Sequence, residues 1–272
     1  WSPYSSPSAF AGNPLFICPL KLMGTGLVDQ TDLNEESFRE TKKVNFNKAL
    51  TYRNRLLEKA WNRLRINTNN PLFSEFESFC LQESYWLDDY ALFEVYKIKF
   101  KNATWNNWPS KAKFRDEKTL KTDNYELSDK IMVEKFKQFI FSIQWKELKK
   151  YLNKNNIKVI GDLPFYVSHD SADVWANQDL FSLRNNKKSD KIAGVPPDYF
   201  DENGQLWNMP VFNWERMKNE DYGWWIRRIS KNLDLYDILR LDHFRAFSSY
   251  WAVPHGEKKA VNGNWEEGPG SD

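Results

Sequence analysis

The sequence predicts an α/β fold, because its hydrophobic pattern changes from helical spacing to strand-like runs after residue 155. From about residue 30 to 152, apolar residues recur at helical spacing, whereas 156–167 forms a β-type apolar run. A helix is then expected over 215–234 and a second apolar strand over 236–241. Helices and strands that alternate in this way are typical of parallel α/β sheets.

The N-terminal segment carries little periodicity. Residues 1–14 are rich in Ser, Pro and Gly, which predicts a structured loop, and the apolar run 15–20 is consistent with a short strand. Gly24 and Gly26 lack the third glycine and the following helix of a dinucleotide-binding motif. No nucleotide cofactor is therefore predicted here.

Three helical regions are expected between 30 and 152. The first ends at Asn67 to Pro71, and the loop 104–110 separates the second from the third. The aromatic stripes on these helices are interpreted as core. They include Phe46, Trp61, Phe76, Phe79, Trp86, Tyr90, Tyr96, Phe136 and Phe139.

Beyond the strand-like run 156–167, a short helix is expected over 170–180 and a long polar loop over 182–210. Within that loop, the segment 194–210 contains both prolines and aromatic residues. Loops of this length without regular structure are usually functional. The aromatic residues Tyr199, Phe200 and Trp207 make the loop a candidate platform and lid for a sugar, or else they simply pin it to the body of the protein.

Composition excludes several classes of protein. With 28% charged and 41% hydrophobic residues and a net charge of +2, the chain is an ordinary globular sequence with no predicted nucleic-acid partner. No apolar stretch approaches the ~18–20 residues of a membrane span. Cys18 and Cys80 are too few for a disulfide framework, so the expected location is a reducing cytoplasm.

The segment 239–247 places charged groups at the end of an apolar strand. Asp242 follows the strand, and Arg240 lies two residues earlier on the same strand face, where its guanidinium favours the carboxylate form. Such a carboxylate suits a nucleophile, while the alternative is a structural ion pair. Asp162 ends the earlier strand-like run, so parallel pairing would bring both carboxylates to one site.

Other chemistries find no support in the sequence. His169, His243 and His255 lack zinc-site spacing, and neither a serine-hydrolase elbow nor a P-loop occurs, so no metal and no cofactor are predicted. His243, beside Asp242, is interpreted as a hydrogen-bond donor to a substrate hydroxyl.

Several motifs together resemble the 4-alpha-glucanotransferases, also called amylomaltases or disproportionating enzymes, of the alpha-amylase superfamily. They occur in the order of that family and span nearly the whole chain. They are SPYSSPSAFAGNP at 2–14, WLDDYALF at 86–93, IGDLPFYVSHDSADVWA at 160–176, GVPPDYFDENGQLW at 194–207 and RLDHFRAF at 240–247.

The resemblance implies a (β/α)8 TIM barrel with a helix-rich insertion. It divides the chain into a barrel-side loop and short strand at 1–29, the helical insertion at 30–150, and barrel units carrying the nucleophile strand at 151–272. The implied reaction is a retaining transfer between maltooligosaccharides or other alpha-1,4-glucans, without a cofactor. It implies no membrane partner, and the sequence predicts no oligomeric state.

The family motifs also imply roles for individual residues. Asp242 matches the nucleophile and Arg240 the arginine that orients it, while Asp162 and Tyr4 match substrate-contacting positions. Further substrate-binding candidates are His243, beside the nucleophile, and Tyr199 and Trp207, in the loop over the acceptor sugar.

Two departures from the family pattern limit this interpretation. The segment Asn208 to Pro210 differs from the Gly-Asn-Pro of many members. The acid/base glutamate lies on a strand after the nucleophile, and neither Glu257, Glu266 nor Glu267 matches its motif. We therefore expect part of a barrel that is inactive alone. The alternatives are an alpha-1,4-glucan hydrolase and a non-catalytic glucan-binding protein.

Overall fold

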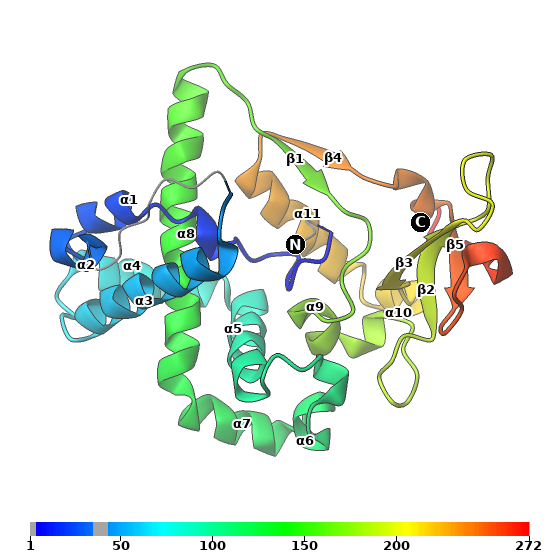
Figure 1. Cartoon of the computed structure of the whole chain (residues 1–272), viewed down its shortest axis with the longest axis horizontal. Coiled ribbons are helices and arrows are strands. Elements are labelled where there is room, and N and C mark those ends of the chain that lie inside the picture. Colours follow the sequence, from blue (N-terminus) through cyan, green and yellow to red (C-terminus); the bar gives the residue numbers. More distant parts are fainter. Residues whose placement is uncertain (1–3, 35–42, 272) are drawn as a thin grey trace. The chain divides into compact units, whose positions relative to one another are not determined.

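A computed structural model describes residues 4–34 and 43–271, which form two compact units (Figure 1). The helical unit comprises residues 11–95 and 121–157, and the strand-bearing unit comprises 1–10, 96–120 and 158–272. This division places 11–29 with the helices and 96–120 with the strands. Two of the four junctions between the units fall within helices, one in α5 (Ser84–Lys99) and one close to the middle of α7 (Glu117–Glu126).

The helical unit is built around one long helix, α8 (Ser128–Lys154), against which α3 (Phe46–Arg65) and α4 (Pro71–Gln82) pack (Figure 1). Asparagine residues cap the N-termini of α3 and α4. The side chain of Asn45 accepts from the N–H of Lys48, and that of Asn70 accepts from the N–H of Leu72. The predicted helix end between Asn67 and Pro71 is confirmed. The elements of this unit are η1 (Pro14–Phe16), α1 (Pro19–Gly24), α2 (Gln30–Asn34), α3 (Phe46–Arg65), α4 (Pro71–Gln82) and the adjoining parts of α5 and α7.

Aromatic rings form the core of the helical unit, as the sequence predicts, but the assignment of Phe46 to the core is wrong, since this first residue of α3 is 46% exposed. Trp61, Phe76 and Phe136 are buried, and their ring centroids lie 5.1 to 6.1 Å apart. Phe139 adds an edge contact with Phe76 at 5.6 Å. These contacts join α3, α4 and α8 through side chains that recur at helical spacing.

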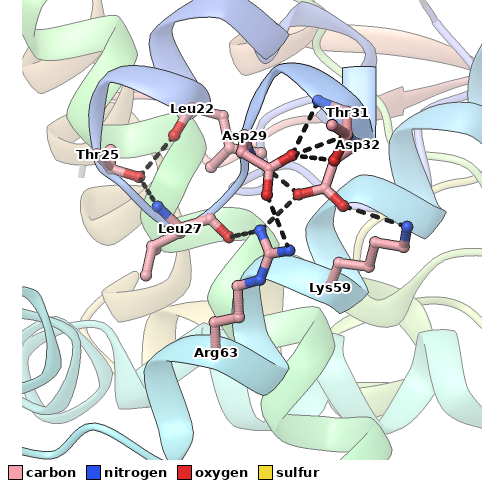
Figure 2. A network of polar contacts seen from close by, with 8 residues as sticks. All are labelled: Leu22, Thr25, Leu27, Asp29, Thr31, Asp32, Lys59 and Arg63. Atoms are coloured by element: carbon pink, nitrogen blue, oxygen red, sulfur yellow. Dashed lines mark hydrogen bonds and ion pairs between the residues drawn. The ribbon is translucent and has the colours of Figure 1, made fainter. Parts of the chain in front are cut away.

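A polar network ties α1 and α2 to α3 (Figure 2). The buried carboxylate of Asp32 accepts from Arg63 at 2.5 Å, from Lys59 at 3.2 Å and from the N–H of Asp29 at 3.0 Å. Burial raises the pKa of Asp32, but these hydrogen bonds and charges outweigh it and hold the pKa at about 2. Arg63 also donates to the carbonyl of Leu27, so one guanidinium fixes the turn between the two short helices.

The predicted strand at 15–20 is wrong. Pro14 and Pro19 each occupy the first turn of a helix, η1 and α1, and Asn13 caps the first of these through the N–H of Leu15. A short apolar run does not distinguish a strand from a helix, and here the prolines decide in favour of helices.

The strand-bearing unit contains a parallel pair of strands and an antiparallel sheet ordered β3-β2-β5-β6. The expected helix over 215–234 is two helices, because Tyr222 adopts a left-handed conformation with φ of 53° between them. The elements are η2 (Trp105–Asn107), α6 (Ser110–Lys113), β1 (Ile160–Leu163), α9 (Ala172–Ala176), η3 (Gln178–Leu180), β2 (Lys191–Val195), β3 (Gln205–Pro210), α10 (Trp214–Asn219), α11 (Gly223–Leu235), β4 (Ile238–Leu241), η4 (Phe244–Phe247), β5 (Ser249–Pro254), η5 (Ala260–Asn262) and β6 (Asn264–Glu267).

Strands β1 and β4 pair in parallel, which confirms the predicted alternation of strands and helices (Figure 1). In their register Asp162 lies opposite Arg240, and Leu163 lies opposite Leu241. Gly161 leaves room for the ring of Tyr236, which a Cβ at this position would approach to 2.2 Å. The pairing therefore sets polar residues of two distant segments side by side.

The predicted loop over 182–210 is wrong in part, because it contains β2 and β3, which pair antiparallel. Strand β2 pairs on its other side with β5, so its hydrogen bonds come from a segment some 60 residues later along the chain. Strand β2 contains Gly194 and is followed by two prolines, so its own sequence indicates a strand only weakly. Its pairing with distant strands decides its structure.

Within residues 4–34 and 43–271, no helix has the length and apolar character needed to cross a membrane.

Candidate functional site

The ends of β1 and β4 bring two carboxylates to a single guanidinium. Nη1 of Arg240 lies 2.6 Å from Oδ2 of Asp162, and Nη2 of Arg240 lies 2.7 Å from Oδ1 of Asp242. The side chains are between 33% and 59% exposed, so all three are accessible to a ligand. The convergence of Asp162 and Asp242 that the sequence predicts is confirmed.

The backbone turns sharply directly after Asp242. The N–H of Asp242 donates to the carbonyl of Leu163 at 3.0 Å, which extends the parallel pairing by one residue. His243 then adopts a left-handed conformation with φ of 48°, and η4 begins at the next residue. A non-glycine residue in this region costs free energy, and such residues concentrate at functional sites.

A pocket of about 390 Å³ opens beside Asp242 and His243. Its walls come from the N-terminal segment, from the residues after β1 and from β3. The lining residues are Tyr4, Ser5, Pro164, Phe165, Tyr166, Trp207, Met209, Asp242 and His243. A largely aromatic wall beside a carboxylate is suited to a ligand with apolar faces and hydroxyl groups.

The rings of Phe165, Tyr166 and Trp207 surround His243 in this pocket. The ring centroids of Trp207 and His243 lie 4.9 Å apart in an edge-to-face arrangement, and Tyr166 lies 6.2 Å from His243. Within the described residues, the buried Nε2 of His243 and the hydroxyl of Tyr166 have no hydrogen-bond partner. Buried polar atoms without a partner are uncommon in folded proteins, so both groups set this part of the pocket apart from an ordinary core.

Burial shifts the titration of both residues. Desolvation lowers the pKa of His243 below its ordinary value, and nearby Arg245 lowers it further, while Asp242 opposes the shift. Burial raises the pKa of Tyr166 well above its ordinary value, and Tyr250 and Glu266 add to this effect. At neutral pH the site therefore offers a neutral imidazole and a neutral phenol.

Tyr4 reaches the pocket because the N-terminal segment is tied to α9. The N–H of Ala172 donates to the carbonyl of Pro7 at 2.8 Å, and the N–H of Ala9 donates to Asp173 at 2.7 Å. The side chain of Tyr4 remains 46% exposed. Segments about 160 residues apart in the sequence thus both contribute walls to the pocket.

Tyr199 is placed differently from the other predicted residues. It lies in the loop between β2 and β3, is 96% exposed and is not among the residues that line the pocket. Its neighbour Phe200 is 93% exposed, and the two rings contact edge to face at 5.5 Å. The loop itself is ordered, because Asp198 accepts the N–H groups of Phe200 and Asp201.

Sequence reasoning did not select several residues that form the pocket. Pro164, Phe165 and Tyr166 directly follow β1, which ends at Leu163, and Met209 follows Trp207 by two residues. The sequence signal for 164–166 was their position just after a strand that carries a carboxylate near its end. Ser5 carried no signal beyond its place next to Tyr4.

Two of the carboxylates that follow Asp242, Glu257 and Glu266, have structural partners. Glu266 accepts from Lys191 and from the hydroxyl of Tyr250, and Glu257 accepts from Asn262 at 3.0 Å. Glu266 and Glu267 lie in β6. Residues 4–34 and 43–271 include no cluster of three or more metal-binding side chains.

Two parallel strands therefore carry an arginine-bridged pair of carboxylates beside a largely aromatic pocket, which is a site suited to a ligand with hydroxyl groups and apolar faces. The family model described as 4-alpha-glucanotransferase (glycoside hydrolase 77) matches residues 1–272, and the chain belongs to this family. The 4-alpha-glucanotransferase of Clostridium butyricum is 43% identical over 270 residues, covering 98% of this chain and 55% of the relative.

Further relatives agree with this assignment. The 4-alpha-glucanotransferase of Aquifex aeolicus is 43% identical, with 99% of this chain and 53% of the relative covered. An amylomaltase of Streptococcus agalactiae, solved in complex with acarbose, superposes with a TM-score of 0.90 at 38% identity over 98% of this chain and 54% of its own. The chain spans about half the length of the relatives it matches.

Proposed function

We propose that the protein transfers alpha-1,4-glucan segments from a donor to the 4-hydroxyl of an acceptor glucan or glucose, by a retaining double displacement. The observation that carries the proposal is the Asp162–Arg240–Asp242 arrangement beside the pocket formed by Trp207 and His243. Membership of the 4-alpha-glucanotransferase family supports it.

In the proposed first step, a carboxylate oxygen of Asp242 attacks the anomeric carbon of the donor. The glycosidic bond breaks, its oxygen takes a proton from an acid, and a covalent glucosyl-enzyme forms. The two hydrogen bonds of Arg240 hold Asp242 in place for this attack. The acceptor 4-hydroxyl then displaces Asp242 and gives up its proton to the same group, now a base.

We infer that this acid/base group belongs to residues outside 1–272. A retaining mechanism places it about 5–5.5 Å from the nucleophile. Asp162 shares Arg240 with Asp242 and is better placed to hold a sugar hydroxyl, while Glu257 and Glu266 are engaged elsewhere. A protein of residues 1–272 alone is therefore expected to give no maltotriose turnover, and turnover at the rate of the longer protein would contradict this inference.

Transfer requires that an acceptor sugar compete with water for the intermediate. The aromatic walls of the pocket, Tyr166 and Trp207 among them, favour a pyranose over water and position its hydroxyl. We propose that the exposed rings of Tyr199 and Phe200 extend this surface to longer glucans, because an exposed apolar pair on an ordered loop marks a binding surface.

The proposed architecture is a (β/α)8 barrel with a helix-rich insertion. The parallel pair β1 and β4, connected through α9 to α11, would be two of its strands. The site then lies at the carboxyl ends of these strands, where barrel enzymes place their catalytic groups.

The test is Asp242→Asn in a protein of the relatives' length, assayed with maltotriose and analysed for products. Wild type should give glucose and longer maltooligosaccharides, whereas shortening without elongation would indicate a hydrolase. Asp242→Asn should abolish turnover yet retain acarbose binding. Asp129→Asn, at an 85% exposed carboxylate of the helical unit, is the matched control.

Two results would refute the proposal. Unchanged turnover in folded Asp242→Asn would exclude Asp242 as the nucleophile. Binding of maltooligosaccharides by wild type without any turnover would favour a non-catalytic glucan-binding protein.

We also propose a cytoplasmic location, which the free thiols of Cys18 and Cys80 support, since cysteines stay reduced there. Fractionation of cells that produce the protein tests this point.

A further inference from the structure

One buried arginine contacts the backbone of the pocket wall. Arg228 lies on α11 with only 2% of its surface exposed. It donates from Nη1 to the carbonyl of Phe165 at 2.9 Å and from Nη2 to the carbonyl of Pro164 at 2.5 Å. Both acceptors belong to residues that line the pocket.

These two hydrogen bonds select a particular backbone shape. In an extended strand successive carbonyl groups point to opposite sides, so one planar guanidinium does not reach both. The segment after β1 must therefore turn at Pro164 and Phe165 so that both carbonyls face Arg228. The same turn sets the ring of Phe165 at 6.3 Å from that of His243, between centroids.

The guanidinium is enclosed by aromatic rings. Its Cζ lies 5.2 Å from the ring centroid of Trp224 and 4.9 Å from that of Trp225. The ring of Trp225 also contacts Phe165 at 5.2 Å. Cation–π attraction and ring packing together hold the guanidinium in one orientation.

Asp173 provides the opposite charge and reaches a second wall of the pocket. Arg228 and Asp173 are both buried; burial lowers the pKa of Arg228, and the charge of Asp173 opposes that shift. Asp173 also accepts the N–H of Ala9, in the segment that carries Tyr4. The buried pair therefore acts on two walls, 164–166 and the N-terminal segment.

We propose that Arg228, with Asp173 as its counter-charge, is a positioning residue that sets the shape of the acceptor pocket. It touches neither substrate nor reacting atoms, but fixes the backbone of Pro164 and Phe165 and hence the walls beside His243. This inference rests on the proposed function, because it assigns the pocket to the acceptor sugar.

Stability alone does not explain a buried charge at this position. Taking a cation and a carboxylate out of water is costly, and apolar residues of similar volume often serve as well or better. A guanidinium offers what an apolar side chain lacks, namely two donors in a fixed fork. The arrangement suits a role in geometry.

The test compares Arg228→Lys with wild type in a protein of the relatives' length. A lysine keeps the charge but does not donate to both carbonyls in a fixed geometry. Arg227→Lys, at the adjacent and exposed arginine of α11, is the matched control. Rates are expressed per folded molecule, well below the thermal midpoint of each variant, so that reduced stability by itself does not change them.

We expect Arg228→Lys to raise the KM for glucose as acceptor and to lower the ratio of transfer to hydrolysis, each by about tenfold or more. The rate of donor cleavage should change much less, and Arg227→Lys should match wild type. If Arg228→Lys does not fold, Asp173→Asn is assayed instead, because its amide oxygen still accepts from Ala9. It should shift the same ratio by about threefold.

The outcomes separate the two proposals. A wild-type protein without transfer activity overturns the proposed function and this inference together. Active wild type with an unchanged acceptor KM and transfer ratio in the folded variant overturns the positioning role alone. An equal fall in every rate would indicate a merely structural arginine and would also overturn it.

Discussion

Replacing Arg240 tests whether one guanidinium organises both carboxylates of the site. Arg240 makes one charge-assisted hydrogen bond to Asp162 and one to Asp242, at 2.6 and 2.7 Å. Such bonds contribute about 1.5–3 kcal/mol each, and the lower end applies here because the Arg240 side chain is 59% exposed. Each lost bond should therefore lower kcat/KM about tenfold.

Two variants separate the contributions. Arg240→Lys keeps the charge but spans only one carboxylate, so we expect about a tenfold loss in kcat/KM for maltotriose disproportionation. Arg240→Met loses both bonds and leaves two carboxylates without a cation, so the loss should be about a hundredfold. Adding Asp162→Asn to Arg240→Met removes the repulsion between the carboxylates and should restore part of the activity.

The assay is initial-rate release of glucose from maltotriose by a protein of the relatives' length, with Arg227→Lys as the control. Arg240→Lys within twofold of wild type would refute the idea that the fork geometry matters. A double variant no more active than Arg240→Met would show that repulsion between Asp162 and Asp242 is not the cause of the loss.

Further predictions concern the pocket and the helical unit. Trp207→Ala should raise the KM for acceptor glucose about tenfold. Trp207→Phe should keep a KM close to that of wild type, because an aromatic ring remains; acceptor titrations measure both values. Asp32→Asn should lower the free energy of unfolding of the helical unit by about 2 kcal/mol at pH 7, from a folded-state pKa of about 2 against 3.8. Because folding lowers that pKa, the stabilisation is present above about pH 4 and is lost as the pH falls toward 2. The difference in free energy of unfolding between wild type and variant, measured by urea unfolding, should therefore be smaller at pH 2.5 than at pH 7. A difference that does not depend on pH would contradict this origin. Tyr199→Ala combined with Phe200→Ala should weaken activity on long glucans more than on maltotriose, and equal loss on both would contradict the proposed extended surface.

Local patterns predict the helical unit better than the sheets. The stripes containing Trp61, Phe76 and Phe136 predicted the core helices, because their spacing follows the helix itself. The pairing of β2 with β5 depends on a distant segment, and no local pattern specifies it. The strand predicted at 15–20 is wrong for a local reason. The apolar run is too short to distinguish a strand from a helix, and two prolines favour helix starts there.

The site shows the same division. The sequence by itself determined that a carboxylate follows an apolar strand at Asp242, that Arg240 shares its face, and that Asp162 lies near the end of another strand, because strand periodicity is local. Only the tertiary structure decided that one guanidinium bridges both carboxylates and that a buried arginine on α11 holds the pocket wall. Such contacts depend on where the chain brings segments more than 60 residues apart, and side-chain spacing carries no information about that distance.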